Sequence, residues 1–275
     1  MTQPVLICRP GARGDALASL LRSGGAEVEA LDVMALEALP EDSATRSVWL
    51  NIDQYDKIVV ISPFAAECLS EALDRYWPQL PVGIDYYSVG SATASILFDQ
   101  LGVRVRIPPA ASLKASAESE RGENTSEALL TLASLKNVSH QRILLVAGEG
   151  GRTLLADTLA ERGAMVTRLA VYRRVFSPPS AAMQARLRAG DYRALIVTSG
   201  ELLEHLAKWC DQAALNQPLI VSSHRLATLA GTLGFSDLKV ASGATPAALA
   251  ATLERSCNPK GADVDQGTSL RASDR

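Results

Sequence analysis

The chain has 275 residues, of which 47% are hydrophobic and 21% charged, the balance of an ordinary globular protein with one large domain or two smaller ones. Its net charge of -3 leaves no general excess of cations to displace counterions from phosphate, which argues against a general nucleic-acid-binding protein. The four cysteines form no CxxC pair and the three histidines show no metal-ligand spacing, so neither a disulfide framework nor a metal site is expected.

Short apolar, β-branched segments alternate with amphipathic helical patterns along almost the whole chain, which is typical of βα units around parallel sheets. The expected strands are, in chain order, Val5–Cys8, Glu27–Val33, Lys57–Ile61, Tyr86–Val89, Val103–Ile107, Arg142–Val146, Met165–Tyr172, Ala194–Thr198, Leu219–Ser222 and Leu238–Ala241. Helices are expected in most of the gaps, one of them over Arg152–Glu161. Ten strands are many for one twisted sheet of this size, so two sheets are predicted.

A weak internal repeat also favours two domains. In each of the segments Arg13–Val33 and Arg152–Tyr172, a helix ends at a glycine and the chain turns directly into a strand. A glycine in the left-handed conformation would cap both helices. Any two βα units share this pattern, so the repeat is equally compatible with a single α/β architecture.

Three further segments bear on the organisation of the chain. The segment Pro108–Thr125 is polar and uneven in charge and is expected to be a mobile loop. The tail over 258–275 has almost no apolar residues and is expected to be disordered. The N-terminal segment lacks an apolar signal-peptide core, and no run of about 18 apolar residues occurs, which predicts a soluble, cytoplasmic protein that spans no membrane.

Glycine, serine or threonine follows nearly every expected strand, where the next helix would begin. These residues make good helix N-caps and fit tight βα turns, so local structure alone can account for them. A helix N-terminus also presents unpaired N–H groups to anions, and ligands of open α/β sheets gather at the carboxyl ends of the strands. Seven such ends, shared between two domains facing one cleft, would suit a ligand with many carboxylates.

Familiar catalytic motifs are absent from the sequence. The segment 148–153 begins like a dinucleotide-binding fingerprint, but Thr153 stands where its last glycine is required. The sequence contains no phosphate-binding GxxxxGK[ST] loop, GxSxG nucleophile elbow or HExxH zinc motif. We therefore expect a binding cleft rich in hydroxyls and amides, with no obvious nucleophile.

The strand ends, taken in order, resemble those of the uroporphyrinogen-III synthase family from Val5 to Leu253. They are Arg9-Pro10, Ile61-Ser62-Pro63-Phe64-Ala65, Val89-Gly90-Ser91-Ala92-Thr93-Ala94, Val146-Ala147-Gly148-Glu149-Gly150-Gly151-Arg152, Val171-Tyr172-Arg173-Arg174, Thr198-Ser199-Gly200 and Val221-Ser222-Ser223-His224-Arg225. Each motif is weak alone, but their order and spacing together are specific.

The resemblance implies two Rossmann- or flavodoxin-like α/β domains with parallel sheets, joined by a two-stranded connector. The first domain would be discontinuous, over 1–37 and 174–256, and the second would span 40–169. The connector strands would lie within Leu31–Leu39 and Thr167–Val175.

The family's substrate is hydroxymethylbilane, a linear tetrapyrrole with many acetate and propionate carboxylates. The implied enzyme is a lyase of haem biosynthesis that cyclises it to uroporphyrinogen III, with loss of water and inversion of ring D through a spiro intermediate. No metal or organic cofactor is implied, and orienting the substrate would supply most of the catalysis. A monomer is expected, and the resemblance is compatible with direct hand-over of the substrate by the preceding pathway enzyme.

The same resemblance assigns candidate site residues. Tyr172 matches a cleft tyrosine that would assist departure of the substrate's hydroxyl, or it is a hinge aromatic packed between the connector strands. Arg9 and Arg152 are candidate partners of substrate carboxylates, or solvated surface charges. The remaining candidates follow strand ends and would bind substrate, cap helices or do both: Ser62, Pro63, Ser91, Thr93, Gly148, Gly150, Gly151, Thr198, Ser199, Ser222 and Ser223. Phe64 departs from the family pattern, which often has asparagine or a small polar residue there.

Three alternatives remain open from the sequence. A two-domain protein that closes on a small anion would share the hinge and cleft, but such proteins usually carry a signal peptide. A nucleotide-dependent enzyme, such as a two-domain glycosyltransferase, would need a phosphate fingerprint or an acidic ribose partner. An inactive, synthase-like regulatory module would keep the fold and lose the reaction.

Overall fold

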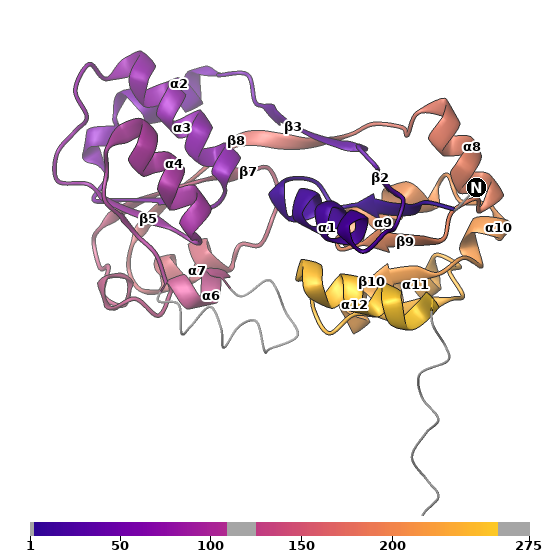
Figure 1. The fold of residues 1–275 in the computed structure, drawn as a ribbon. Helices are drawn as coiled ribbons and strands as arrows, with labels where there is room; N and C mark the ends of the chain where they lie inside the picture. The colour runs from indigo at the N-terminus through magenta and orange to yellow at the C-terminus, as the bar shows by residue number, and fades with distance from the viewer. Residues whose placement is uncertain (1–2, 109–124, 258–275) are drawn as a thin grey trace, which may run out of the picture. The chain divides into compact units, whose positions relative to one another are not determined.

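The computed structural model describes residues 3–108 and 125–257. Most of the expected loop Pro108–Thr125 and the whole expected tail 258–275 lie outside these residues. The chain forms two compact units: unit 1 comprises Met1–Asp32 with Pro179–Arg275, and unit 2 comprises Val33–Pro178. Each unit has its own sheet with helices on it (Figure 1), which confirms the prediction of two α/β domains with parallel sheets.

Unit 1 contains a five-stranded, fully parallel sheet in the order β11-β10-β9-β1-β2. Its strands are β1 (Val5–Cys8), β2 (Val28–Ala30), β9 (Ala194–Val197), β10 (Leu219–Val221) and β11 (Leu238–Val240). Its helices are α1 (Ala12–Ser23), α8 (Ala181–Ala189), α9 (Gly200–Ala207), α10 (Gln212–Leu215), α11 (His224–Thr232) and α12 (Pro246–Cys257).

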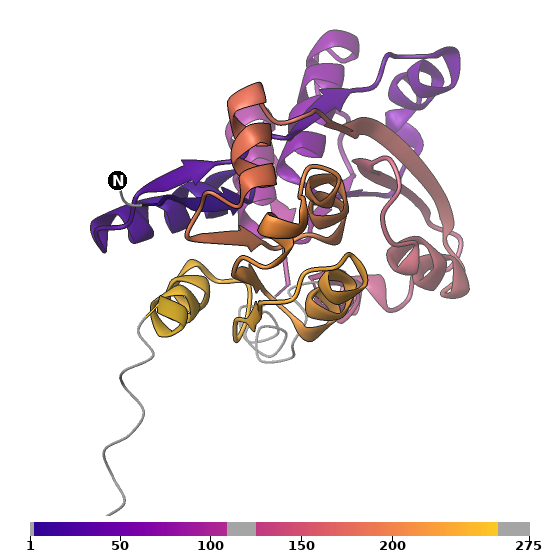
Figure 2. The same cartoon turned by 90° about the vertical axis from the view of Figure 1, so that its right-hand side faces the viewer.

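The central strands of unit 1 are buried on both faces, as their unbroken apolar sequences predict. On one face, Val5 and Ile7 pack with Leu17 of α1 and Leu249 of α12. In Figure 2 the indigo α1 and the yellow α12 lie on the same side of the strands. Residues that point the other way, such as Leu195, are equally buried, because α9 and α11 contact β9 and β10.

Unit 2 contains a six-stranded sheet in the order β3-β8-β7-β4-β5-β6, parallel except for the β3–β8 pair. Its strands are β3 (Met34–Ala38), β4 (Lys57–Val60), β5 (Asp85–Ser88), β6 (Val105–Arg106), β7 (Arg142–Gly148) and β8 (Met165–Phe176). Its helices are α2 (Ser43–Leu50), α3 (Pro63–Tyr76), α4 (Ser91–Leu101), α6 (Thr125–Leu129) and α7 (Leu154–Glu161), with short 3-10 helices η1 (Ile52–Gln54) and η2 (Ala133–Leu135).

Alternate residues of unit 2's strands face two separate cores. Ile58 and Val60 pack with residues of α2, α3 and α4 on one face. Val59 and Tyr87 pack with residues of α6, η2 and α7 on the other. Figure 1 shows these two groups of helices on opposite sides of the sheet. Both faces are therefore closed, and only the strand ends of this sheet are left for polar chemistry.

Several expected strand limits were wrong. The expected strand Glu27–Val33 stops at Ala30, because β2 pairs with β1 over only three residues, and the chain then starts β3 at Met34. The expected strand Val103–Ile107 shrinks to the two residues of β6, an edge strand that pairs only with Tyr86 and Tyr87. The expected helix Arg152–Glu161 begins at Leu154, with Thr153 as its N-cap.

The β3–β8 pair carries the chain into and out of unit 2. It is an antiparallel ribbon that runs from the Met34–Phe176 pair to the Ala38–Tyr172 pair, so β8 extends beyond the expected end at Tyr172. The expected domains 1–37 with 174–256 and 40–169 divide this ribbon between them. Both strands instead lie wholly in unit 2, since β8 continues the parallel pairing with β7 and holds β3 at its other side.

Candidate active site

The carboxyl ends of parallel strands meet at one edge of a sheet, and the candidate residues follow those ends. In unit 2 the edge is formed by the turns after β4, β5 and β7, together with the facing part of β8. In unit 1 it is formed by the turns after β1, β9, β10 and β11. Each unit thus has one carboxyl edge where its candidates can act.

Tyr172 is the centre of the polar contacts at unit 2's carboxyl edge. It lies on β8 beside Gly148 of β7, and its side chain is 6% exposed. The Ser62 hydroxyl, in the turn between β4 and α3, donates a hydrogen bond to the Tyr172 phenol oxygen at 3.1 Å. Ser62 also caps α3 by accepting the Ala65 N–H at 3.2 Å. Two of the candidates predicted from the sequence are therefore in direct contact.

The ring of Tyr172 is held as firmly as its hydroxyl. The Phe64 ring meets it edge-on, with the centroids 5.2 Å apart and the planes at 80°. A Cβ atom on Gly148 would lie 2.6 Å from a ring carbon of Tyr172, so only glycine fits there. The β7–β8 register shifts between Ala147 and Gly148, and the Glu149 N–H donates to the Tyr172 carbonyl at 2.7 Å.

The other candidates of unit 2 differ in accessibility. Thr93, in the first turn of α4, is only 2% exposed, whereas Ser91 at the start of that helix is exposed. Pro63 is the first residue of α3, where its missing N–H costs nothing, and it too is exposed. Gly150 and Gly151 have φ of +71° and +80°, which explains why glycine follows β7.

Arg152 lies close to this edge but its guanidinium is engaged. It forms an ion pair with Glu127 of α6, with N–O distances of 2.6 and 3.3 Å. Both side chains are about half exposed to solvent. A substrate carboxylate would have to compete with Glu127 for this arginine, and a role for Arg152 in binding stays a prediction.

At unit 1's carboxyl edge, Arg9 reaches across the sheet. Its Nη1 donates to the carbonyl oxygen of Ala244, after β11, at 2.5 Å. Partial burial, and secondarily the nearby Arg13, lower the pKa of Arg9 from its ordinary value. The carbonyl of Arg9 packs so closely on α1 that a Cβ on Gly14 would lie 1.8 Å from it. This arginine is therefore fixed at both its backbone and its side chain.

Only some of the hydroxyls at unit 1's carboxyl edge form hydrogen bonds among the described residues. Ser223 caps α11 and accepts the Leu226 N–H at 3.4 Å. Ser199 precedes α9 without a side-chain capping bond. Thr198 and Ser222, like Ser199, are half-buried, and the described part of the chain gives these three hydroxyls no hydrogen-bond partner. They remain open to an acceptor such as a carboxylate.

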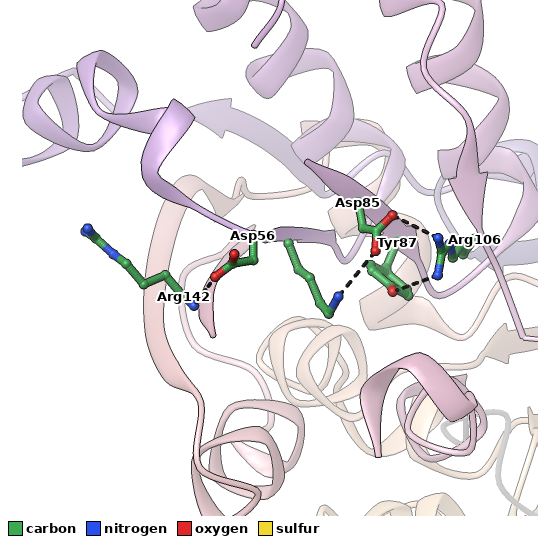
Figure 3. Close-up of polar contacts among 6 residues, drawn as sticks. Asp56, Asp85, Tyr87, Arg106 and Arg142 are labelled. Atoms are coloured by element: carbon green, nitrogen blue, oxygen red, sulfur yellow. Dashed lines mark hydrogen bonds and ion pairs between the residues drawn. The ribbon is translucent and has the colours of Figure 1, made fainter. Parts of the chain in front are cut away.

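The opposite, amino edge of unit 2's sheet has a different chemistry (Figure 3). The buried Lys57 ammonium and the Arg106 guanidinium share the Asp85 carboxylate, at 3.3 and 2.9 Å. Both cations also lie 5.7 Å from the centre of the Tyr87 ring. Nearby, the Asp56 carboxylate accepts the Arg142 backbone N–H at 2.7 Å. The Asp85 carboxylate at this edge is therefore already paired with two cations.

Two negative findings concern the described residues only. They contain no group of three or more His, Cys, Asp or Glu placed to hold a metal ion. None of their helices is long and apolar enough to cross a membrane.

The family model described as uroporphyrinogen-III synthase HemD matches residues 15–251 of the chain. The chain belongs to the uroporphyrinogen-III synthase family. Uroporphyrinogen-III synthase of Escherichia coli K12 is 32% identical over 259 residues, covering 91% of this chain and 99% of that one. The Salmonella typhimurium synthase is 32% identical over 256 residues, with the same coverage.

Solved structures of the uroporphyrinogen-III synthase family share the fold. A mutant synthase from Thermus thermophilus matches with a TM-score of 0.57 at 19% identity, covering 94% of this chain and 100% of that one. The synthase from Helicobacter pylori matches with a TM-score of 0.57 at 13% identity and the same coverage. The predicted family and fold class, and the prediction of an enzyme of haem biosynthesis, are confirmed.

Sequence reasoning missed two features of the edges. Phe64 was noted only as a departure from the family pattern, although an aromatic residue two positions after the N-cap Ser62 could have indicated packing on a nearby ring. Gly14 was not singled out, yet a glycine in the first turn of α1 signals close backbone approach, here to Arg9.

Proposed function

We propose that this chain is a uroporphyrinogen-III synthase, which converts hydroxymethylbilane into uroporphyrinogen III with loss of water and inversion of ring D. The observation that carries this proposal is the 32% identity to the Escherichia coli synthase over 91% of the chain, a span that includes both units. The family model matches residues 15–251, which include the strand ends after β4, β5, β7, β9, β10 and β11. A binding protein that shared only the fold would not need this likeness along the whole length.

The carboxyl edges offer the donors that a polycarboxylate substrate needs. Helix α4 in unit 2, and α9 and α11 in unit 1, begin at these edges with N–H groups that have no intrahelical partner. The open hydroxyls of Thr198, Ser199 and Ser222 add further donors. Each unit by itself therefore offers positions for acetate or propionate groups of the substrate. Binding at several points would orient the linear tetrapyrrole for ring closure, which can contribute up to about 7–11 kcal/mol to lowering the barrier.

Tyr172 is the proposed proton donor for the hydroxyl that leaves the substrate. Because Ser62 donates to its phenol oxygen, the proton of Tyr172 is not needed for that bond and can be given to an acceptor. The C–O bond of the hydroxymethyl group breaks, the proton from Tyr172 completes the departing water, and pyrrole A forms an azafulvene as its N–H proton returns to the Tyr172 phenolate. Ring D then attacks through its substituted carbon, and the spiro intermediate fragments and recloses with ring D inverted. On reclosure the α-hydrogen of ring D leaves as a proton and restores the N–H of pyrrole A.

The decisive assay of the function supplies hydroxymethylbilane, oxidises the products and separates the isomers. The proposed enzyme yields isomer III faster than the substrate closes spontaneously. If the chain yields only isomer I, at the spontaneous rate, it is not a synthase. The anion-binding protein and the inactive regulatory module would then be the remaining interpretations.

The same assay tests Tyr172 through the substitution Tyr172→Phe. We expect kcat to fall at least about tenfold while the folded structure persists, since only the proton donor is removed. Tyr86→Phe is a matched control, because Tyr86 lies in the same core and its buried hydroxyl has no hydrogen-bond partner among the described residues. An unchanged kcat in Tyr172→Phe would remove the phenol from the mechanism.

Four expectations stay predictions. They are a cytoplasmic monomer, hand-over of the substrate by the preceding pathway enzyme, one cleft formed by both domains, and a reaction without a cofactor. Dependence on a cofactor is checked by assaying the purified protein after exhaustive dialysis against a chelator. Full retention of isomer III formation is the expected result.

A further inference from the structure

We propose that Ser62 is a positioning residue that acts through Tyr172, and that it does not bind the substrate itself. This inference rests on the proposed function, because it concerns how the phenol is prepared to give up its proton. The sequence alone placed Ser62 among residues that would cap a helix or bind a carboxylate. Its contacts in the structure assign it a different task.

The hydrogen-bonding capacity of Ser62 is the first argument. A serine hydroxyl has one proton to donate and two lone pairs that accept. We assign the proton to the Tyr172 phenol oxygen, which lies 3.1 Å from the Ser62 Oγ, and one lone pair takes the Ala65 N–H at 3.2 Å. No proton is left for a substrate carboxylate, which can only accept. Ser62 would therefore repel a carboxylate unless it gave up Tyr172.

The direction of the Ser62–Tyr172 bond is the second argument. As the N-cap of α3, Ser62 receives a backbone N–H, and this contact turns its own proton away from the helix. The proton meets the phenol oxygen, which therefore accepts on that side. With this assignment the phenol's O–H points elsewhere, and this is the orientation that a donor to a leaving hydroxyl requires.

The rigidity of both partners is the third argument. Ser62 stands between the buried strand β4 and Pro63, whose ring fixes the first turn of α3. The Tyr172 ring is confined by the Phe64 ring at 5.2 Å and by Gly148, where no side chain fits. The hydroxyl of Tyr172 can thus be displaced only by moving α3 or the end of β7. Phe64 and Ser62 both belong to the start of α3, so one helix end fixes the ring and the hydroxyl together.

Other capping serines show that capping alone does not require such contacts. Ser180 caps α8 by accepting the Met183 N–H at 3.3 Å, and it is exposed. It has the same local role as Ser62 without an aromatic hydroxyl beside it. Ser180 therefore serves as a matched control for loss of a serine cap.

The experiment combines Ser62 variants with the presence or absence of the phenol hydroxyl. Ser62→Gly removes the hydroxyl while keeping a residue that is tolerated at an N-cap, and Ser62→Thr retains both hydrogen-bonding functions. Each is assayed for isomer III formation in the otherwise unchanged chain and in Tyr172→Phe.

We expect Ser62→Gly to lower kcat about five- to tenfold with KM changed less than twofold, and Ser62→Thr to restore kcat. In Tyr172→Phe, Ser62→Gly should lower kcat by less than twofold further. Ser180→Gly should leave kcat and KM unchanged.

The outcomes separate this inference from the proposed function. If the unchanged chain forms isomer III but the losses from Ser62→Gly and Tyr172→Phe multiply in the double variant, Ser62 acts independently of Tyr172 and the inference is overturned. A rise in KM without a fall in kcat would instead make Ser62 a substrate ligand. If Ser62→Gly loses activity in parallel with its thermal stability, and Ser180→Gly shows the same losses, the role of Ser62 is capping alone. Only the absence of isomer III from the unchanged chain would reject the function itself.

Discussion

The two edges of unit 2's sheet carry different kinds of side chain, charged groups at one edge and hydroxyls at the other. At the amino edge, the cations of Lys57 and Arg106 share the Asp85 carboxylate beside the ring of Tyr87. At the carboxyl edge, the hydroxyls of Ser62 and Tyr172 are held by a hydrogen bond and by ring and backbone contacts. The first arrangement stabilises the fold, and the second keeps a neutral donor in a fixed place.

This difference follows from what each edge must leave available. Ion pairs use charge internally, so a charged cluster has little capacity left for a ligand. Neutral hydroxyls and helix N-termini do not need an internal counter-charge, and they keep donors that a carboxylate can use. We therefore expect substitutions at the carboxyl edge to act on turnover and substitutions at the amino edge to act on stability.

The largest expected effect comes from Gly148→Ala at the carboxyl edge. The new Cβ would lie 2.6 Å from the Tyr172 ring, so the ring must leave the position in which it contacts Ser62 and Phe64. A displacement of this kind can reduce turnover about 100-fold, and we expect a fall in kcat of that order, measured as isomer III formation.

Gly231→Ala is the matched control for Gly148→Ala. A Cβ at Gly231, an exposed position within α11, meets no atom within 4 Å. This control should keep kcat and stabilise its helix slightly. Normal kcat in Gly148→Ala would show that Tyr172 does not need its observed position.

The next largest effect is expected at the amino edge, for Asp85→Ala. Lys57 is 6% exposed and Asp85 is its counter-charge at 3.3 Å, so this substitution leaves a buried ammonium without its partner. Since Asp85 itself is partly exposed, water can moderate the cost, and we expect the free energy of unfolding to fall by about 2 kcal/mol. The measurement is urea unfolding, with kcat determined at a temperature where the variant is folded. A kcat reduced tenfold in folded protein would contradict the separation between the two edges.

The contrast between the edges also marks what the sequence could and could not predict. The strand ends after β4 and β7 were located from apolar runs followed by serine or glycine, because both patterns are local. The contact between Ser62 and Tyr172 joins residues 110 positions apart, and it depends on β8 pairing beside β7 with a register shift. No local pattern encodes that shift, so the resemblance gave the residues and only the structure gave their partners.

The same reasoning explains the amino edge, which the sequence analysis did not single out. Lys57, Asp85 and Arg106 each begin or end a short strand, and alone each is compatible with a solvated surface charge. They become a cluster because β4, β5 and β6 are neighbours, with Lys57 opposite Asp85 and Tyr87 opposite Arg106. Parallel strand order is fixed by the packing of helices on both faces, which is not a local property.

A smaller effect is expected from alkaline pH on the helix that carries the carboxyl-edge residues. Burial, together with Glu71 and Glu67, raises the pKa of the Cys68 thiol on α3 to about 11. The folded state therefore favours the neutral thiol, and its contribution to stability is complete below the unfolded pKa near 9 and is lost as pH rises toward 11. The free energy of unfolding is compared at pH 8 and pH 10. We expect its fall in Cys68→Ala to be up to about 1 kcal/mol smaller than its fall in the unchanged chain. Parallel pH profiles of the two proteins would show that folding does not raise the pKa of this thiol.

The smallest effect is expected from Arg106→Met, which tests how the amino-edge cluster divides its stabilisation. Arg106 is about half exposed, whereas Lys57 is buried, although both cations contact the same carboxylate. Removing the exposed partner leaves the Lys57–Asp85 pair intact, and exposed ion pairs contribute little because water and salt screen them. We expect the free energy of unfolding to change by no more than about 0.5 kcal/mol, with kcat unaffected. A loss as large as that of Asp85→Ala would mean that Arg106 holds Asp85 in place, so that the cluster acts as one unit and its exposed member is as important as the buried one.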